Sequence, residues 1–345
     1  MKAAVYYGIR DVRVQDWPTP KAEMGEVVVR VLRCAVCGTD KRIYTHGQKN
    51  VVPPTVTGHE IVGLVDQVGP GVSGLKKGQK VICATVVGCG KCVYCRREQY
   101  NLCDTFTALG YDYPGGFAEY VKIPARAVAQ GNVIPIPEDM SPDCAALIEP
   151  LSCVLNGQEY LNAQRGDRAV VFGGGPIGLM HAGALKAKGC DPVIVADVAA
   201  ERLGYVKQLG VGTPLLTGAD PVAEILKAGG GEKFDVIVTA CSVKAVQGYA
   251  LQLARKKARV SFFAGVPKDD PILAVDTNHI HYNEISVFGA FASNLRHYRQ
   301  AAEMVAGGGF PADKFVTHRF KLADIKKAFD AIEAGHGIKI VVDCE

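Results

Sequence analysis

The residues of this chain best suited to chemistry are a cysteine, a histidine and a glutamate in its N-terminal half. Cys37, His59 and Glu60 offer a thiolate, an imidazole and a carboxylate, which zinc takes as ligands when one position stays open to water or substrate. Glu149 is a further candidate, either as a direct ligand or as the group that hydrogen-bonds a metal-bound water. Single cysteines and histidines also occur as packed core residues, and the spacing alone leaves that alternative open.

A second group of ligands has the spacing of a closed metal site. Four thiolates in one lobe fill a tetrahedral zinc site and leave no room for substrate, so we expect this zinc to be structural. A pair of disulfides and a redox C-x-x-C are the alternatives, but C-x2-C-x2-C spacing in an intracellular chain favours a metal. The four residues are Cys89, Cys92, Cys95 and Cys103.

The stretch 170–178 predicts a strand, a glycine turn and the start of a helix, and it fits the dinucleotide-binding pattern G-x-G-x-x-G. Unpaired N–H groups at the helix N-terminus favour the negative charge of a pyrophosphate. Asp197 ends the apolar run 193–196, where its carboxylate can bond a ribose 2′-hydroxyl but repels a 2′-phosphate, so NAD is favoured over NADP. The residues expected to contact the cofactor are Gly173, Gly175, Pro176, Ile177, Gly178 and Asp197.

An open zinc site and a dinucleotide fold supply complementary chemistry. Zinc is a Lewis acid that makes a bound hydroxyl easier to deprotonate, and nicotinamide accepts a hydride. The combination predicts NAD-linked oxidation of an alcohol to a carbonyl, with the reverse reduction.

Composition sets wider limits. The chain has 345 residues, 48% of them hydrophobic, which suits two domains with buried cores. The net charge of +4 is spread along the chain without a Lys/Arg block, so nucleic acid is not an expected partner and a small-molecule substrate is. No apolar run has the length of a membrane span, and residues 1–7 lack the apolar core of a signal peptide. We therefore expect a soluble cytoplasmic protein.

The elements that must position these residues fall into two patterns. Residues 1–35 and 58–83 consist of short β-like runs punctuated by proline and glycine, which predicts a small barrel without a helix of any length, and a looped segment follows Asp40. Helical patterns cover 143–147 and 152–161. Glycine residues near 115 and 116 begin a further strand of the barrel.

From residue 166 onward, strands alternate with helices. This alternation predicts a parallel sheet covered on both faces. The terminal apolar run 338–342 needs a sheet partner, and we expect the N-terminal domain to provide it. The expected helices are 200–209, 221–227, 243–253, 295–306 and 325–332, and the expected strands are 170–172, 193–196, 214–216, 234–238, 259–263 and 286–289.

These motifs resemble the zinc-containing alcohol dehydrogenases of the medium-chain dehydrogenase/reductase superfamily. Residues 58–72 match the family signature G-H-E-x2-G-x5-G-x2-V, with Gly63, Gly69 and Val72 at the later positions. The segments 37–40 and 149–151 are similar to the family's catalytic-zinc segments, and the four-cysteine lobe is similar to its structural-zinc lobe. The resemblance covers essentially the whole chain.

The resemblance implies an α/β fold with two domains. One is a GroES-like, β-rich catalytic domain formed discontinuously by residues 1–150 and 290–345. The other is a Rossmann NAD-binding domain, a doubly wound parallel sheet, formed by residues 151–289. It further implies two zinc ions per chain, one catalytic and one structural, and assembly as a homotetramer or a homodimer.

The resemblance also implies roles for groups around the zinc. Thr39 stands where the family places a hydroxyl that passes the alcohol proton towards the cofactor ribose and solvent, although a local backbone hydrogen bond is an alternative use of this side chain. Many relatives complete the relay with a histidine where this chain has Arg42, which cannot exchange protons at neutral pH. The relay here ends at ribose or water, or recruits His46. Asp40 is expected to orient a zinc ligand, or to serve as a turn residue.

The polyol dehydrogenases, sorbitol dehydrogenase among them, are the nearest subfamily in these motifs, with L-threonine 3-dehydrogenase and sugar-phosphate polyol dehydrogenases as alternatives. In NAD-using sorbitol dehydrogenases a basic residue like Arg202 lies near the adenosine ribose; a solvated helix-face arginine is the alternative. Residues 290–292 are Ala-Phe-Ala. At the corresponding place, near the substrate pocket, sorbitol dehydrogenases have a sequence similar to Phe-Arg-Tyr. Arg296 and Tyr44 are candidate substrate contacts or ordinary surface and packing residues.

Two other classes of protein remain as alternatives. A zinc-ribbon-like binding module would explain the four-cysteine lobe but not the nucleotide fold. A non-catalytic zinc- and nucleotide-binding protein would be expected to have lost a catalytic ligand, whereas all four candidates are present here.

Overall fold

The computed structural model describes all 345 residues and divides into two compact units. Unit 1 comprises residues 1–152, 292–308 and 312–345, and unit 2 comprises residues 153–291 and 309–311. The first crossing from unit 1 to unit 2 falls within helix α4 (Ile148–Gln158). None of the helices combines the length and the apolar character needed to span a bilayer.

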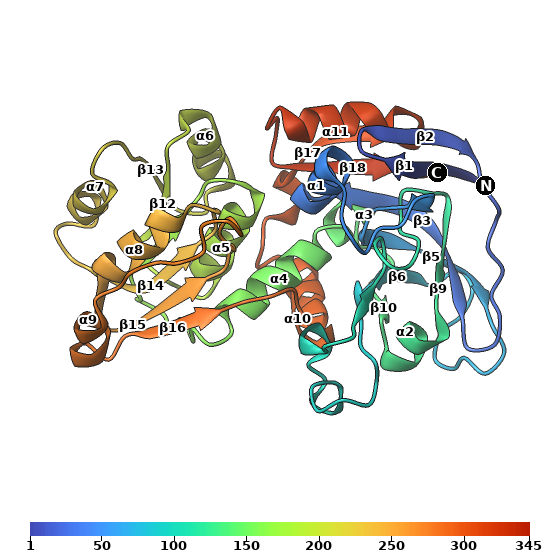
Figure 1. The fold of residues 1–345 in the computed structure, drawn as a ribbon, viewed down its shortest axis with the longest axis horizontal. Helices are drawn as coiled ribbons and strands as arrows, with labels where there is room; N and C mark the ends of the chain where they lie inside the picture. Colours follow the sequence, from blue (N-terminus) through green and yellow to red (C-terminus); the bar gives the residue numbers. More distant parts are fainter. The chain divides into compact units, whose positions relative to one another are not determined.

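Unit 1 is built on β-sheet (Figure 1). Its largest sheet has the order β10-β6-β5-β3-β18-β17, with β9 also paired to β3; β2-β1-β4 and β7-β8 form smaller sheets. The strands are β1 (Lys2–Gly8), β2 (Asp11–Asp16), β3 (Val27–Val36), β4 (Thr55–Val56), β5 (Glu60–Val68), β6 (Lys80–Cys83), β7 (Val86–Val87), β8 (Thr107–Ala108), β9 (Tyr120–Ile123), β10 (Val133–Pro135), β17 (Val316–Lys321) and β18 (Lys339–Asp343).

The C-terminal strand β18 lies beside β3 in this sheet. The two strands are antiparallel, with Ile340 opposite Val36 and Val342 opposite Cys34. These side chains are buried in the apolar core of unit 1, which explains why the last strand of the chain is an uninterrupted apolar run after its lysine. The expected pairing of the terminal strand with the N-terminal part of the chain is confirmed.

Unit 1 also contains helices, of which α3 (Pro142–Ala145) and α11 (Ile325–Glu333) pack against this sheet. The others are α1 (Gly38–His46), α2 (Ala125–Gln130), the first turn of α4 and α10 (Leu295–Ala306). Four short 3₁₀ turns accompany them: η1 (Cys95–Arg97), η2 (Tyr100–Leu102), η3 (Ala312–Lys314) and η4 (Leu322–Asp324).

The prediction of a looped segment after Asp40 was wrong, because α1 follows β3 directly, whereas residues 1–35 and 58–83 contain no helix, as expected. The carboxylate of Asp40 accepts the backbone N–H of Cys37 at 2.8 Å and so caps the first turn. Ile43 and Tyr44 form the buried stripe of the helix, and the ring of Tyr44 stacks on Phe329 of α11 with centroids 4.8 Å apart. Packing against α11, rather than helix propensity, stabilises this polar segment.

The helices near Glu149 also differ from the expected ones. We expected helices at 143–147 and 152–161, whereas α4 begins four residues before the second of these, at Ile148. Pro150 is compatible with this start, because a proline in the first turn gives up an N–H that has no partner there. Glu149 therefore lies in the first turn of a helix.

Unit 2 is a six-stranded parallel sheet of order β13-β12-β11-β14-β15-β16. Numbered within the unit, this is 3-2-1-4-5-6, the order of the Rossmann fold. The strands are β11 (Ala169–Phe172), β12 (Val193–Asp197), β13 (Thr213–Leu216), β14 (Phe234–Thr239), β15 (Ala254–Phe262) and β16 (Ser286–Gly289), and the helices are the remainder of α4, α5 (Pro176–Ala187), α6 (Ala200–Leu209), α7 (Pro221–Ala228), α8 (Lys244–Leu253) and α9 (Thr277–Tyr282).

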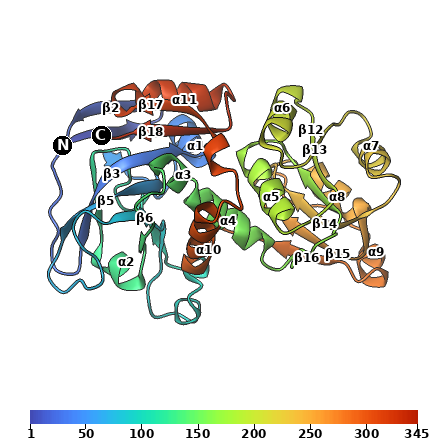
Figure 2. The ribbon, with the colours of Figure 1, turned by 180° about the vertical axis from the view of Figure 1, so that it is seen from behind.

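Helices lie on both faces of this sheet. Figures 1 and 2 view the chain from opposite sides and show α8 on one face and α5 on the other. The central strands β11, β12 and β14 are buried along their whole length, as expected of parallel strands with both faces covered. The predicted α/β class and doubly wound sheet are confirmed.

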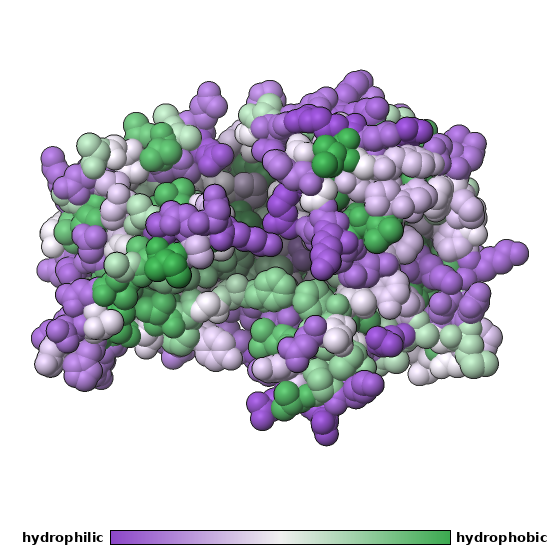
Figure 3. All heavy atoms as spheres, in the orientation of Figure 1, coloured by the Kyte–Doolittle hydropathy of each residue, from purple (hydrophilic) through white to green (hydrophobic).

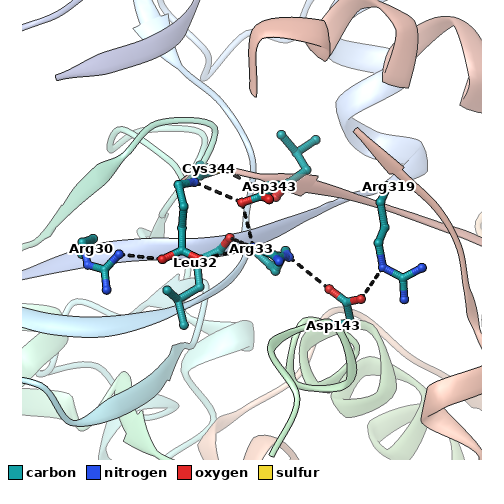
Figure 4. A network of polar contacts seen from close by, with 10 residues as sticks. Arg30, Leu32, Arg33, Asp143, Arg319, Asp343 and Cys344 are labelled. Atoms are coloured by element: carbon teal, nitrogen blue, oxygen red, sulfur yellow. Dashed lines mark hydrogen bonds and ion pairs between the residues drawn. The ribbon is translucent and has the colours of Figure 1, made fainter. Parts of the chain in front are cut away.

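A network of charged groups ties the C-terminal strands of unit 1 to α3 (Figure 4). Asp143 lies between two arginines: it accepts from Nε of Arg33 at 3.1 Å and from Nε of Arg319 at 2.5 Å. Nη1 of Arg33 also donates to Asp343 at 2.8 Å and to the carbonyl of Leu32 at 2.7 Å. The network therefore joins β3, β17, β18 and the helix that precedes Glu149.

Candidate catalytic metal centre and cofactor site

The candidate zinc ligands Cys37, His59 and Glu60 lie together because neighbouring strands carry them. β3 and β5 are antiparallel, with Ala35 opposite Glu60, so the residues just after β3 lie beside those at the start of β5. One ligand atom from each of the three residues lies within 4.8 Å of the others, with His59 and Glu60 buried and Cys37 half-buried. A thiolate, an imidazole and a carboxylate at this separation fit a zinc ion.

The backbone before His59 has a conformation that requires glycine. Gly58 has φ of +92°, and a Cβ there would lie 2.8 Å from the ring of Phe117 and 2.9 Å from Sγ of Cys34. The glycine of the Gly58-His59-Glu60 motif therefore allows the backbone to adopt a positive φ just before β5 and to pack closely against core side chains. It supplies geometry and no chemistry.

Asp40 contacts two of the three candidate ligands, Cys37 and His59. One carboxylate oxygen accepts the N–H of Cys37, and the other lies 3.4 Å from Nδ1 of His59. Asp40 is 1% exposed, so its charge acts in a region that water does not screen. Burial opposes a charge on His59, but Asp40 and Tyr111 raise the pKa of the imidazole well above its ordinary value. This contact leaves Nε2 as the nitrogen that faces away from Asp40 and suits it to orient the ring.

Glu60 forms a buried ion pair that the sequence motifs did not indicate. Nζ of Lys339 lies 2.6 Å from each carboxylate oxygen of Glu60, and the two residues are 4% and 0% exposed. Burial opposes the charge on Lys339, but Glu60 and Cys37 outweigh it and raise the pKa of the ammonium. The carboxylate is thus shared between a lysine and the candidate metal position.

Glu149 is not a member of the three-residue group. It lies in the first turn of α4 and is half-buried. Its negative charge contributes to the raised pKa values of Lys339 and Tyr111, although Glu60 for Lys339 and burial for Tyr111 are larger causes. Glu149 is therefore electrostatically coupled to residues that contact the group.

Tyr111 is a second neighbour that no motif indicated. Its ring centroid lies 5.2 Å from that of His59, at an interplanar angle of 41°. The tilted ring contact brings the phenol of Tyr111 against the imidazole, which is 4% exposed. The phenol pKa is raised, chiefly by burial, so the hydroxyl stays protonated at neutral pH.

The candidate relay residues follow one face of α1. Thr39, Arg42 and His46 are spaced three and four residues apart, which aligns them along a helix. Nη2 of Arg42 donates to Gln48 at 2.8 Å, and the His46 ring lies 2.6 Å from the hydroxyl of Thr45. Thr39 is half-buried, whereas Arg42 and His46 are exposed.

The two candidate substrate contacts differ in their surroundings. Tyr44 is 8% exposed and stacked on Phe329, so it is a core residue of the α1–α11 contact. Arg296 is exposed in the first turn of α10. The packing alternative is thus the one that fits Tyr44.

The four cysteines of the lobe also lie together. The sulfur atoms of Cys89, Cys92, Cys95 and Cys103 are all within 4.8 Å of one another. Backbone N–H groups of Lys91 and Cys92 lower the pKa of Cys89 to about 6, whereas burial raises the pKa of Cys95 to about 12. Four sulfur donors this close fit a closed tetrahedral zinc site.

The glycine turn has the geometry that a bound pyrophosphate requires. Gly173 has φ of +105°, and a Cβ on Gly178 would collide with the carbonyl oxygen of Gly173. Pro176 is the first residue of α5, after Gly175, and nothing lies within 4 Å of where a Gly175 Cβ would be. Open space at a helix N-terminus with free N–H groups suits an anion. Ile177 lies in the first turn of α5.

Asp197 ends β12 beside this turn. Its carboxylate accepts the N–H of Gly174 at 2.6 Å and the N–H of Ala199 at 2.8 Å, and the side chain is 5% exposed. Nη1 of Arg202 lies 3.8 Å from the same carboxylate, with the arginine side chain 55% exposed. The two residues form a pair at the position expected for the adenosine ribose.

Comparisons with known proteins agree with this geometry. Residues 23–138 match the family model of the alcohol dehydrogenase GroES-like domain, and residues 176–307 match that of the zinc-binding dehydrogenases. The two segments together cover more than half of the chain. The chain belongs to the zinc-containing alcohol dehydrogenase family, and it is an enzyme that uses zinc and a nicotinamide cofactor.

Individual relatives span the whole chain. A sorbitol dehydrogenase from Bombyx mori is 31% identical over 349 residues, covering 99% of this chain and 97% of that protein. An L-threonine 3-dehydrogenase from Pyrococcus furiosus is 31% identical over 348 residues with the same coverage. An Escherichia coli alcohol dehydrogenase solved with NADH has a TM-score of 0.90, at 29% identity and 99% coverage of both chains.

Proposed function

We propose that this enzyme oxidises a secondary alcohol or polyol to the ketone and transfers the hydride to NAD. The observation that carries the proposal is the grouping of Cys37, His59 and Glu60 within 4.8 Å, in unit 1 of a chain whose unit 2 has the dinucleotide-binding turn. Unit 1 would be the catalytic domain and unit 2 the NAD-binding domain.

Cys37, His59 and Glu60 would hold the catalytic zinc, with Glu149 as a further ligand or as the acceptor for a hydroxyl at the site. Zinc supplies Lewis acidity, which lowers the pKa of a coordinated hydroxyl. Asp40 orients the imidazole of His59 through the 3.4 Å contact at Nδ1. Lys339 compensates the charge of Glu60 and limits how much negative charge the ligands present.

Thr39 moves the alcohol proton. Its Oγ1 would accept that proton and release its own to solvent or to the ribose of a bound cofactor. Arg42 cannot take part, because it stays protonated at neutral pH. His46, one turn beyond Arg42 on the same face of α1, is exposed and can release the proton to water.

The glycine turn of unit 2 would hold NAD, with the N-terminus of α5 as the site for the pyrophosphate. Gly173, Gly175, Pro176, Ile177 and Gly178 form the cradle. Asp197 accepts from the ribose hydroxyls, and its charge disfavours the 2′-phosphate of NADP. Arg202, whose Nη1 lies 3.8 Å from the carboxylate of Asp197, would lie beside that ribose.

The substrate class follows the relatives, which include sorbitol and threonine dehydrogenases. A polyol is our first choice; L-threonine and a sugar-phosphate polyol are the alternatives. An NAD-coupled screen of polyols, diols, sugar phosphates and threonine, followed by nicotinamide absorbance, tests it. We expect chelator-sensitive turnover with one class; no turnover with any class would overturn the proposal.

Cys89, Cys92, Cys95 and Cys103 would hold the second, structural zinc ion. Their sulfur atoms form a closed donor set without an oxygen or nitrogen ligand. A cluster of free thiols that binds metal is characteristic of a reducing compartment, which supports the cytoplasm as the location of this enzyme.

We further propose assembly into a homotetramer, or a homodimer as its half. The support is strand β16, the outer strand of the unit 2 sheet, which has neither charge nor proline. Val287 within the strand and Phe291 just after it are exposed apolar side chains, and Figure 3 shows hydrophobic residues gathered over β15 and β16. An edge strand without charge or proline presents unpaired N–H and C=O groups that can pair with a strand of another chain. Light scattering of Val287→Lys against the parent tests this: a smaller assembly is expected, and an unchanged mass would contradict it.

A further inference from the structure

We infer that residues 292–308, the segment by which the chain returns to unit 1, position two of the candidate zinc ligands through two pairs of hydroxyl groups. The segment itself contributes no ligand atom to the three-residue group. Each pair instead ends on the backbone carbonyl of a candidate ligand. The inference rests on the proposed function, because it concerns the same catalytic zinc.

The first pair ends on His59. The hydroxyl of Tyr298, on α10, donates to Oγ1 of Thr85 at 3.2 Å, and the N–H of Thr85 donates back to the Tyr298 oxygen at 3.1 Å. Oγ1 of Thr85 then donates to the carbonyl oxygen of His59 at 3.0 Å. Each hydroxyl proton in this series of hydrogen bonds has an acceptor. The hydroxyl hydrogen bonds therefore run in one direction, from Tyr298 through Thr85 to His59.

The second pair ends on Glu149. Oγ of Ser152 donates to the carbonyl oxygen of Glu149 at 2.6 Å and lies 2.7 Å from Oγ of Ser293. A serine hydroxyl has one proton, so Ser293 is the donor to Ser152. A serine that bonds a carbonyl three residues back is common within a helix; the buried partner from residue 293 is what distinguishes this one.

Burial makes both pairs effective. Thr85, Ser152, Ser293 and Tyr298 are each at most 5% exposed, so water cannot replace a lost partner. Removing one hydroxyl leaves a buried polar atom unpaired or lets the carbonyl move. Either change shifts the backbone that aims His59 or Glu149, and partners outside the ligand set typically alter metal affinity by about 10- to 100-fold.

Tyr298→Phe, Thr85→Val and Ser293→Ala each remove one hydroxyl with little change of shape. Tyr6→Phe is the matched control, because the buried hydroxyl of Tyr6 donates to the carbonyl of Ile43, which is not a ligand candidate, at 3.2 Å. The readout is zinc affinity by chelator competition, together with the visible absorption of the cobalt-substituted site. Neither measurement requires turnover.

We expect Tyr298→Phe and Thr85→Val each to weaken the catalytic zinc about tenfold, at the lower end of such effects because they act through the backbone. The double variant should lose no more than Thr85→Val alone, because both act through the same carbonyl. Ser293→Ala, combined with Tyr298→Phe or with Thr85→Val, should weaken zinc binding by a further, independent factor. The cobalt absorption should shift in each, while Tyr6→Phe and the zinc of the four-cysteine lobe stay as in the parent.

The inference is overturned if folded Tyr298→Phe and Ser293→Ala bind the catalytic zinc as tightly as Tyr6→Phe does. These two substitutions decide the question even if Thr85→Val does not fold. A failure of the proposed function looks different: the parent itself would then bind zinc only in the four-cysteine lobe.

Discussion

Lys339 neutralises Glu60 from the other end of the chain. The two residues are 279 positions apart, yet Nζ of Lys339 lies 2.6 Å from each carboxylate oxygen. The pair forms because β18 enters the sheet beside β3, which in turn pairs with the strand that begins at Glu60. The last strand of the chain is therefore part of the candidate metal centre.

Removal of this lysine should destabilise unit 1 strongly. In the zinc-free enzyme, Lys339→Met leaves the buried carboxylate of Glu60 without a partner, which costs about 3–5 kcal/mol in comparable cases. Adding Glu60→Gln should restore much of the loss, because no buried charge then remains. Urea unfolding followed by the fluorescence of Trp17, the single tryptophan, reports on unit 1. A Lys339→Met variant as stable as the parent would show that the ion pair is not important.

The charged network of Figure 4 should depend on its two arginines unequally. The side chain of Arg33 is 21% exposed and bonds Asp143 and Asp343, whereas that of Arg319 is 56% exposed and bonds Asp143 alone. We expect Arg33→Ala to cost about 1–2 kcal/mol and Arg319→Ala less than about 1 kcal/mol. The same unfolding assay measures both, and equal losses would contradict this ranking.

Local patterns were sufficient to predict much of the fold. The strands of unit 2 are short apolar runs with glycine turns, and the helix 295–306 has the predicted bounds. The candidate ligands Cys37, His59 and Glu60 were chosen from their types and motif, although only the pairing of β3 with β5 explains why they lie together.

Lys339 and α1 could not be found in this way, for physical reasons. The partner of Lys339 is distant in sequence, and the one local signal is a lysine inside an otherwise apolar terminal run, which implies a buried countercharge. The segment 38–46 is polar, so its helix depends on contacts with α11 that no local pattern contains. Tyr111 likewise reaches His59 only through the folded barrel.

Asp197 should determine which nicotinamide cofactor is preferred. Asp197→Asn removes the charge that repels a 2′-phosphate and releases Arg202, now 3.8 Å away, to bind that phosphate. Loss of hydrogen bonds to a charged acceptor should lower kcat/KM for NAD by about tenfold or more, while NADP is affected less or improves. Comparison of kcat/KM for the two cofactors is the test; an unchanged ratio would count against the assignment of Asp197.

His181 is a buried neutral histidine in unit 2. Nε2 of Gln158 lies 3.2 Å from its Nδ1, and an amide nitrogen is a donor, so Nδ1 accepts and the ring proton is on Nε2. Burial, assisted by the charge of Lys188, lowers the pKa of His181 to about 3. Protonation of His181 is therefore disfavoured in the folded chain.

This histidine should make unit 2 less stable in acid. The unfolded chain protonates an ordinary histidine near pH 6.5, so below about pH 6.5 it binds more protons than the folded chain, and stability falls by up to about 1.4 kcal/mol per pH unit. Thermal midpoints at about pH 7.5 and 5.5 should differ less for His181→Gln than for the parent. Identical pH dependence in the two proteins would contradict this prediction.

The zinc content of the purified enzyme and of Cys37→Ser tests the central claim most directly. We predict two zinc ions per parent chain, one for each ligand group, and one per Cys37→Ser chain, which should also lose turnover but retain NAD binding, because Cys37 lies in unit 1 and the glycine turn in unit 2. A Cys37→Ser enzyme that keeps both zinc ions and its turnover would contradict the account.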